Sequence, residues 1–338
     1  MKSIKALLIL MISMISVFIF GGCKENKNKI TIAEVAHSVF YAPQYVAIEK
    51  GFFAQEGIEV SLVNANGADK VMAALLSKDA QIGLMGPEAS IFVYIGGQKN
   101  YAINFAQLTR TDGSFIVSRE KIDNFDLSML KGKSILGGRK GGVPEMTLEY
   151  VLKQAGLTVG QDDESVISSG GVYVRTDVQF AAMAGAFTSG EGDFTTLFEP
   201  TATTVANSGK AYVVASVGKY AGEVPYTAFS ALKDYIENNE DIILAFTRAV
   251  YKGQLWVESH SAREVAEVIY PQFTSNTIEE LTVVMQRYKD INAWAKTPFF
   301  SETALENLIK IMKEAKELDK DVPYDKIVTT KFANSVLK

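Results

Sequence analysis

The sequence has one cysteine, Cys23, and only two histidines, His37 and His260, in 338 residues. A single cysteine excludes an intramolecular disulfide, so the fold has to be stabilised by its hydrophobic core. Two distant histidines and one cysteine also cannot supply the nitrogen and sulfur ligands that structural zinc sites use. We therefore expect neither a disulfide framework nor a metal site.

Neither sign of charge dominates, since 34 Lys and Arg residues against 39 Asp and Glu residues give a formal net charge of −5. Nucleic-acid-binding proteins usually present a strongly basic face, so this mildly acidic mixture argues against a nucleic-acid partner. After residue 22, no hydrophobic run is a convincing membrane span. The length that remains suits roughly two globular domains.

Residues 1–22 have the pattern of a secretory signal peptide. Two lysines precede an apolar run over residues 6–20, which is short for a membrane span. The small residues that end at Cys23 are similar to a bacterial lipobox, although Phe20 stands where leucine is usual. We expect Cys23 to carry lipid and residues 23–29 to tether an extracytoplasmic domain to the outer face of the membrane. The alternative is an ordinary signal peptide with an incidental cysteine.

Strand and helix patterns alternate from residue 30 onward, which predicts an α/β fold with parallel, doubly wound sheets. The predicted strands are 30–35, 58–63, 80–85, 134–136, 171–175 and 194–198, and the predicted helices between them are 44–50, 70–77, 146–155 and 177–184. Beyond about residue 224 the chain is predicted to be mostly helical, over 240–258, 261–270, 276–288 and 301–317. Ser261 and Glu264 have the spacing of a capping box.

Three predicted strands are followed by a proline that starts a helix, namely Pro87, Pro144 and Pro200. Proline suits the first helical position, and the remaining N–H groups of that turn favour an anion or acceptor. In doubly wound sheets these helix starts lie at the carboxyl ends of the strands, where ligands bind. Gly141 and Gly142 would let a ligand approach the backbone. We therefore expect a ligand cleft, although such helix starts are common in any α/β protein.

Three segments resemble one known family. They are residues 37–58 (HSVFYAPQYVAIEKGFFAQEGI), 73–88 (AALLSKDAQIGLMGPE) and 192–200 (GDFTTLFEP). They are similar to the SsuA/THI5-like (NMT1) periplasmic solute-binding proteins, which serve ABC importers for aliphatic sulfonates, taurine, nitrate and thiamine pyrimidine precursors.

The resemblance implies the type II periplasmic-binding-protein fold, in which two doubly wound α/β lobes joined by two crossover strands close over a ligand cleft. The crossings would fall near residues 107–114 and 213–226. Lobe one would then hold residues 30–112 plus 226–338, and lobe two residues 113–225. Such a protein is expected to be a monomer whose partner is an ABC permease.

The resemblance also implies residues that face the ligand: Phe40, Tyr41, Gly67, Ala68, Pro87, Glu88, Gly141, Gly142, Val143, Pro144 and Glu199. His37 and Tyr226 are further ligand-facing candidates, because a histidine in the first loop and an aromatic ring near a crossing could both reach the cleft. Glu88 and Glu199 would oppose a sulfonate and favour a ligand with N–H donors, or each caps its own helix start. The aromatic residues would sandwich a flat ring, or they belong to the core. His37 either touches the ligand or bonds nearby backbone.

We therefore expect a lipid-anchored solute-binding subunit of an ABC importer, with no catalytic residue and no cofactor. A nitrogen heteroaromatic such as a thiamine pyrimidine precursor is the first candidate ligand, followed by an aliphatic sulfonate or taurine, or nitrate. Arg139 and Arg110 would neutralise an anionic ligand, or they are surface charges.

Two alternatives are a pyrimidine-precursor synthase-like enzyme and a surface lipoprotein that binds another protein. The enzyme is disfavoured because Phe40 and Tyr41 stand where that branch has an asparagine-histidine pair. The chain also has no cysteine to supply the cysteine-rich motif of that branch.

Overall fold

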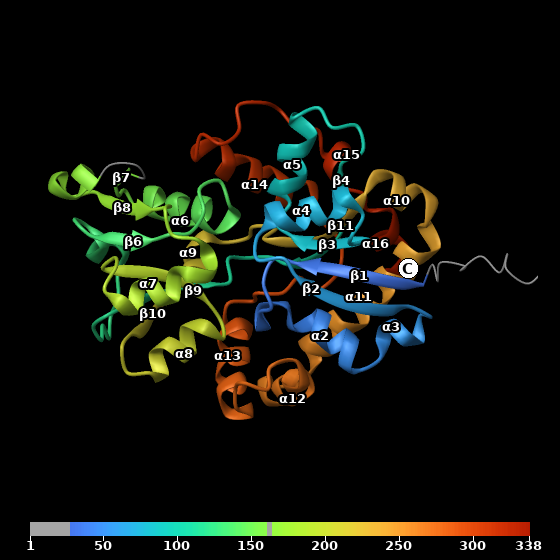
Figure 1. Ribbon diagram of the computed structural model, residues 1–338, viewed down its shortest axis with the longest axis horizontal. Coiled ribbons are helices and arrows are strands. Elements are labelled where there is room, and N and C mark those ends of the chain that lie inside the picture. Colours follow the sequence, from blue (N-terminus) through green and yellow to red (C-terminus); the bar gives the residue numbers. More distant parts are fainter. Residues whose placement is uncertain (1–27, 161–163) are drawn as a thin grey trace, which may run out of the picture.

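The computed structural model describes residues 28–160 and 164–338 (Figure 1). The predicted signal peptide and the lipidation site Cys23 lie outside the described residues. Within the described ranges, no helix is both long and apolar enough to cross a lipid bilayer.

The first lobe is built on a five-stranded sheet with the strand order β2-β1-β3-β11-β4. Its strands are β1 (Lys29–Glu34), β2 (Glu59–Asn64), β3 (Ile82–Met85), β4 (Ala102–Thr109) and β11 (Thr227–Leu232). β1 pairs in parallel with β2 and with β3. Ile30 and Ile32 of β1 are fully buried, as the alternating apolar pattern of this strand requires.

The second lobe is built on a six-stranded sheet with the order β10-β5-β9-β6-β8-β7. Its strands are β5 (Ser114–Ser118), β6 (Ser134–Leu136), β7 (Val159–Gly160), β8 (Val172–Arg175), β9 (Phe194–Phe198) and β10 (Tyr212–Ser216). β6, β7, β8 and β9 pair in parallel. The two sheets stand side by side, as Figure 1 shows.

The sequence predicts parallel sheets, whereas each observed sheet is mixed. One strand in each sheet runs in the opposite direction to the others. β11 runs antiparallel to β3 and β4, and β5 runs antiparallel to β9 and β10. These are the two strands that the chain enters directly after passing from one lobe to the other. A segment that arrives from the opposite lobe enters its strand at the end that is nearest to that lobe. The strand therefore runs away from the cleft.

Helices cover both sheets. In the first lobe they are α2 (Ala42–Glu49), α3 (Phe52–Gln55), α4 (Ala68–Ser77), α5 (Glu88–Ile95), α10 (Lys233–Asn238), α11 (Glu240–Ser259), α12 (Ala262–Ile269), α13 (Ile278–Asp290), α15 (Tyr324–Ile327) and α16 (Lys331–Val336). In the second lobe they are α6 (Val143–Gln154), α7 (Met183–Ser189), α8 (Thr201–Asn207) and α9 (Val217–Ala221). α14 (Glu302–Glu314) lies beside α6, where Lys310 Nζ is 3.3 Å from the Tyr150 hydroxyl.

Short 3-10 helices complete the chain. They are η1 (Val39–Tyr41), η2 (Leu127–Leu130), η3 (Glu164–Ser169), η4 (Phe180–Ala182) and η5 (Tyr270–Gln272). The helix predicted at 177–184 is wrong in position, because η4 and then α7 occupy residues 180–189. Met183 and Phe187 of α7 are both buried and lie four residues apart, so they share the face that packs against the sheet.

Candidate functional site

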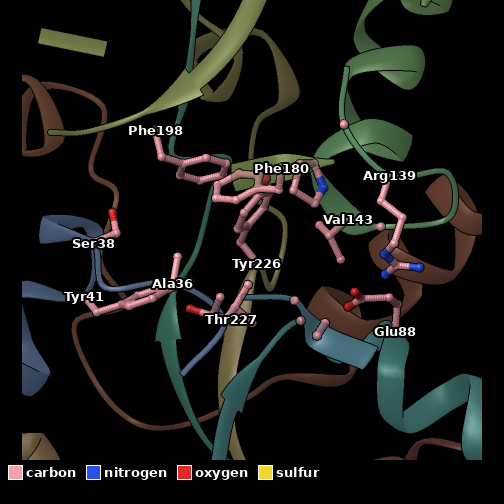
Figure 2. Close-up of a pocket in the computed structure, with 17 residues that line it drawn as sticks. Ala36, Ser38, Tyr41, Glu88, Arg139, Val143, Phe180, Phe198, Tyr226 and Thr227 are labelled. Carbon is pink, nitrogen blue, oxygen red and sulfur yellow. The ribbon is translucent and has the colours of Figure 1, made fainter. Parts of the chain in front are cut away.

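A cavity lies between the two lobes, at the carboxyl ends of strands from both sheets (Figure 2). The cavity has a volume of about 80 Å³. On the same scale a single water molecule needs about 10–15 Å³, so the cavity has room for a small molecule. The lining residues are Val35, Ala36, Ser38, Tyr41, Gly67, Ala68, Gly86, Glu88, Gly138, Arg139, Gly142, Val143, Pro144, Phe180, Phe198, Tyr226 and Thr227.

The connections that follow the parallel strands position most of this lining. In the first lobe, the loops after β1, β2 and β3 bring Tyr41, Ala68 and Glu88 to the cavity. In the second lobe, the loop after β6 and the start of α6 bring Arg139 and Val143. The site therefore lies at the strand ends where open α/β sheets bind ligands.

Glu88 is the buried charged residue of the cavity wall. It is the first residue of α5 and is 2% exposed, and its Oε2 atom has no hydrogen-bond partner. Burial raises the pKa of the carboxyl group to about 7, because desolvation disfavours the charged form. Arg139 and the backbone N–H groups of Glu88, Val143 and Ala89 act in the opposite direction and favour the carboxylate. The N–H groups of Glu88 and Ala89 belong to the start of α5, so the carboxyl group also interacts with its own helix start, as the helix-capping alternative predicts.

The carboxyl group of Glu88 folds back over Gly86. A Cβ atom on residue 86 would lie 2.0 Å from Glu88 Oε2, a distance that real atoms do not adopt. Glycine at this position therefore makes room for the acid inside the cavity wall.

Arg139 faces Glu88 at one end of the cavity (Figure 2). Its side chain is 41% exposed, and its Nε atom lies 3.8 Å from Asp69 Oδ1 of the first lobe. Arg139 is thus a cation at the rim of the cavity, whereas Glu88 is an acid in its wall. We predicted that Arg139 either neutralises an anionic ligand or is a surface charge. Its position fits both alternatives, because it lines the cavity and is also exposed to solvent.

Aromatic rings form the apolar wall. Phe198 lies between Phe180 and Tyr226, with ring centroids 5.6 and 6.0 Å away. Tyr41 and Tyr226 are buried, with 4% and 3% of their surface exposed. Burial raises the pKa of the Tyr226 hydroxyl, and the nearby Asp112 carboxyl acts in the same direction. Both tyrosines are therefore neutral and present their ring faces or hydroxyl groups to a ligand.

The structure brings eight of the predicted residues to this cavity: Tyr41, Gly67, Ala68, Glu88, Gly142, Val143, Pro144 and Tyr226. Five others do not line it: His37, Phe40, Pro87, Gly141 and Glu199. Pro87 and Gly141 are direct chain neighbours of lining residues. Phe40 is fully buried, and its ring contacts Gly113 and packs 5.1 Å from Tyr288, so it belongs to the core.

Glu199 points away from the cavity. Its Oε2 accepts the backbone N–H of Thr203 at 2.8 Å, and Oε1 pairs with Arg287 of α13. The carboxylate therefore caps the first turn of α8 and contacts the other lobe, which matches the helix-capping alternative. Close to Pro200, the third of the helix-starting prolines, Phe198 lines the cavity and Glu199 does not.

His37 also turns away from the cavity. Nδ1 donates to Glu34 Oε1 at 2.7 Å, and Nε2 donates to the Gln272 carbonyl at 2.9 Å. Its ring stacks on Phe273 at 4.7 Å. This arrangement matches the alternative in which His37 bonds nearby backbone.

Sequence reasoning missed several lining residues, including Ser38, Gly86, Phe180, Phe198 and Thr227. Phe198 had a usable signal, because it is the last residue of a predicted strand that runs to the cleft. Phe180 had none, since it reaches the cavity from the short 3-10 helix η4, whose position depends on tertiary packing. Among residues 28–160 and 164–338, no group of three or more His, Cys, Asp or Glu side chains is placed to hold a metal ion.

Comparisons with known proteins place this architecture in a family. Residues 39–263 match the model of the NMT1/THI5-like family. The chain is 41% identical over 326 residues to YtlA of Bacillus subtilis (strain 168), whose name provisionally describes it as a binding protein. This alignment covers 96% of the present chain and 95% of YtlA.

Solved structures share the fold. The alkanesulfonate-binding protein SsuA from Xanthomonas axonopodis pv. citri, bound to MOPS, has a TM-score of 0.69 at 14% identity over 90% of this chain and 98% of that chain. The periplasmic nitrate-binding protein NrtA from Synechocystis PCC 6803 has a TM-score of 0.62 at 16% identity, over 90% and 91%. The fold is therefore that of periplasmic binding proteins, and by its family match and its full-length relative the chain belongs to the NMT1/THI5-like family.

Proposed function

We propose that this chain is the extracytoplasmic ligand-binding subunit of an ABC importer, anchored to the membrane by lipid on Cys23. The observation that carries the proposal is a cavity at the strand ends whose walls come from both lobes. A ligand that contacts both lobes binds the closed form better than the open form, so its binding drives closure. The closed shape is what the permease recognises, and no bond of the solute is broken.

The cavity walls favour a small, flat ligand with N–H groups. Phe180, Phe198 and Tyr226 offer ring surfaces, and Glu88 offers an acceptor without a partner. A nitrogen heteroaromatic such as a thiamine pyrimidine precursor is therefore our first candidate. An aliphatic sulfonate or taurine, or nitrate, comes next, because SsuA and NrtA share the fold.

Thermal-shift screening of the processed protein tests this function. The screen covers aminopyrimidines, taurine, alkyl sulfonates and nitrate. A ligand present at 100 times its Kd stabilises the folded protein by about 2.7 kcal/mol, which gives a clear rise in Tm. If no small molecule raises the Tm and one of them is turned over, the proposal fails in favour of the enzyme.

The lipid anchor has its own test. Cells that express the chain are fed a radiolabelled fatty acid, and the label is expected in the wild-type protein and absent from Cys23→Ser. Label in both proteins, or in neither, contradicts an anchor at Cys23.

A further inference from the structure

We propose that Glu88 sets the charge of the ligand: its carboxylate occupies the positive end of α6 and leaves one oxygen for an N–H donor, so the cavity excludes small oxyanions. This inference rests on the proposed function of the cavity as a solute site. It goes beyond that function by naming Glu88 as the residue that selects among the candidate ligands.

The first observation is the free acceptor. Glu88 Oε2 is buried in the cavity wall and has no hydrogen-bond partner. A buried acceptor without a partner is costly, because it has lost its water and gained nothing in return. Above pH 7 the carboxyl group of Glu88 is mostly ionised and only accepts hydrogen bonds. An N–H group of a ligand then removes this cost, whereas a sulfonate or nitrate oxygen cannot donate and would leave the cost in place.

The second observation is the position of the carboxyl group relative to the opposite lobe. α6 is a twelve-residue helix, and its N-cap residue, Gly142, has no side chain that could cap its first turn. Val143, the first residue of that turn, and Glu88 line the same cavity from opposite lobes. In agreement with this placement, the backbone N–H of Val143 lowers the pKa of the Glu88 carboxyl group. An acid from the first lobe therefore stands where an anionic ligand would gain from the helix dipole.

The third observation concerns the nearest cation. Arg139 lies at the rim with 41% of its side chain exposed, and Asp69 is its ion-pair partner. An oxyanion that enters the cavity would meet the buried carboxylate of Glu88 before it gained a dedicated cation. Like charges at close range in a buried site repel strongly, because little water screens them.

Isothermal titration with two probes tests the inference, at a pH well above 7 so that Glu88 is ionised. Methanesulfonate is the oxyanion and 4-aminopyrimidine is the N–H donor. The variants are Glu88→Ala, which empties the end of α6, and Glu88→Gln, which keeps the shape and removes the charge. Glu317→Gln is the matched control, since it removes one negative charge beside Gly141 but does not line the cavity and is not the ion-pair partner of Arg139. Circular dichroism establishes that each variant is folded.

We expect Glu88→Ala to bind methanesulfonate at least tenfold more tightly than the wild type, with a smaller gain in Glu88→Gln. We expect both variants to bind 4-aminopyrimidine at least tenfold more weakly, and Glu317→Gln to behave as the wild type. Should Glu88→Ala unfold, Glu88→Gln decides the outcome. The inference is overturned if neither variant gains methanesulfonate affinity, or if Glu317→Gln gains as much.

The solute-binding function and the role of Glu88 are overturned by different results. If the screen finds a solute for the wild type but the Glu88 variants gain no anion affinity, only the inference about Glu88 is lost. If the screen finds no solute at all, the proposed function is lost with it.

Discussion

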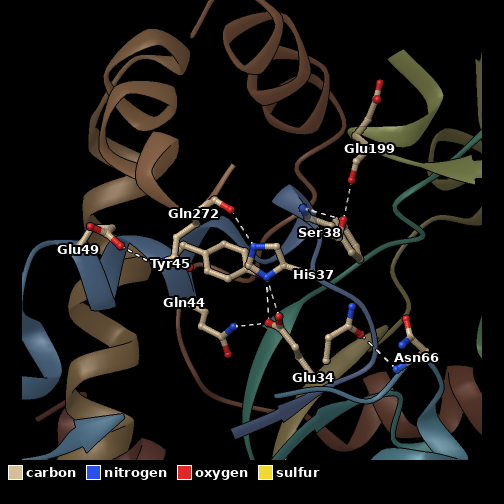
Figure 3. A network of polar contacts seen from close by, with 11 residues as sticks. Glu34, His37, Ser38, Gln44, Tyr45, Glu49, Asn66, Glu199 and Gln272 are labelled. Carbon is tan, nitrogen blue, oxygen red and sulfur yellow. Dashed lines mark hydrogen bonds and ion pairs between the residues drawn. The ribbon is translucent and has the colours of Figure 1, made fainter. Parts of the chain in front are cut away.

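At the scale of single residues, His37 carries a charge that its surroundings dictate. The shortest contacts of its two ring nitrogens are to acceptors, the Glu34 carboxylate and the Gln272 carbonyl (Figure 3). The Tyr45 hydroxyl also lies 3.3 Å from Nδ1, but it donates to Glu34. This arrangement favours the imidazolium form, in which both nitrogens donate. Gln44 and Tyr45 donate to the other oxygen of Glu34, so the buried carboxylate has partners on both sides.

This charge makes the stability of the protein depend on pH. The hydrogen bond to Glu34 raises the pKa of His37 above its usual value of 6.5. The stabilisation is then fully present below about pH 6.5 and is lost as the pH rises through the raised folded-state pKa. We expect His37→Gln to lower the free energy of unfolding by about 1 kcal/mol at pH 5.5, because the half-exposed ring is partly screened by solvent. Urea unfolding at pH 5.5, 7 and 9 measures this, and a difference independent of pH would contradict the imidazolium assignment.

Gly86 is the second residue with a specific requirement. Its substitution by alanine places a Cβ atom 2.0 Å from Glu88 Oε2, and the flexible acid has to move. We expect Gly86→Ala to cost less than about 1 kcal/mol of unfolding free energy, since the end of a side chain yields more easily than backbone. We expect its affinity for 4-aminopyrimidine to fall at least tenfold. Titration calorimetry and urea unfolding separate the two effects, and unchanged binding would show that the position of Glu88 is unimportant.

At the scale of elements, α11 packs on α2 through a glycine. A Cβ atom on Gly253 would lie 2.2 Å from the Pro43 carbonyl oxygen and 3.2 Å from Ala47 Cβ. Both neighbours belong to α2, so neither yields without moving that helix. The absence of a side chain at position 253 sets the distance between the two helices.

We expect Gly253→Ala to lower the free energy of unfolding by about 1–3 kcal/mol, the usual range for an overpacked core. The control is Gly185→Ala in α7, where no atom lies within 4 Å of the added Cβ. Alanine is the better helix former by about 1 kcal/mol, so the control should be neutral or stabilised. Equal losses in the two variants, measured by urea unfolding, would refute the packing explanation.

Sequence reasoning located the elements that have local signals. β6 and β9 have the predicted bounds, because each is a short apolar run between turn-forming residues. The capping box predicted at Ser261 and Glu264 is confirmed, with both of its hydrogen bonds present. These features depend on side chains within a few residues of one another, so the local sequence contains the information.

The features that escaped prediction depend on tertiary contacts. The reversed direction of β5 and β11 follows from the paths between the lobes, and no residue within either strand signals it. The same applies to the site. Glu88 and Glu199 each precede or follow a proline at a helix start, yet one lines the cavity and the other pairs with Arg287. The difference depends on Arg287 of α13, which binds Glu199 and lies almost ninety residues further along the chain.

At the scale of the whole molecule, Glu199 joins the two lobes. Its backbone carbonyl accepts the Ser38 hydroxyl of the first lobe at 2.6 Å, and its backbone N–H donates to the Tyr288 hydroxyl at 3.2 Å. Its side chain, which is fully buried, pairs with Arg287. Neither Glu199 nor Arg287 lines the cavity, so we infer that this pair favours the closed form whether or not a ligand is present.

We therefore expect Arg287→Gln to favour the open form. The substitution leaves the buried carboxylate of Glu199 without its counter-charge, while the Thr203 N–H remains as a partner. A hydrogen bond to a charged group contributes about 1.5–3 kcal/mol. A loss of that size shifts the ratio of open to closed molecules by about ten- to hundredfold, since 1.4 kcal/mol corresponds to a factor of ten. Small-angle scattering of the ligand-free variant should then give a larger radius of gyration than the wild type.

Arg263→Gln is the control for this experiment. Arg263 is also an arginine near the surface, but its partners Glu267 and Glu279 lie on α12 and α13 of the same lobe and are largely exposed. Exposed pairs contribute about 0–1 kcal/mol, and this one does not span the cleft, so the radius of gyration should stay at the wild-type value. The affinity of Arg287→Gln for any solute found in the screen should fall by the same factor as its closed population, because only the closed form offers both walls of the cavity. An Arg287→Gln protein with wild-type dimensions and wild-type affinity would mean that the Arg287–Glu199 pair does not control closure and that other contacts, such as Lys310–Tyr150, hold the lobes together.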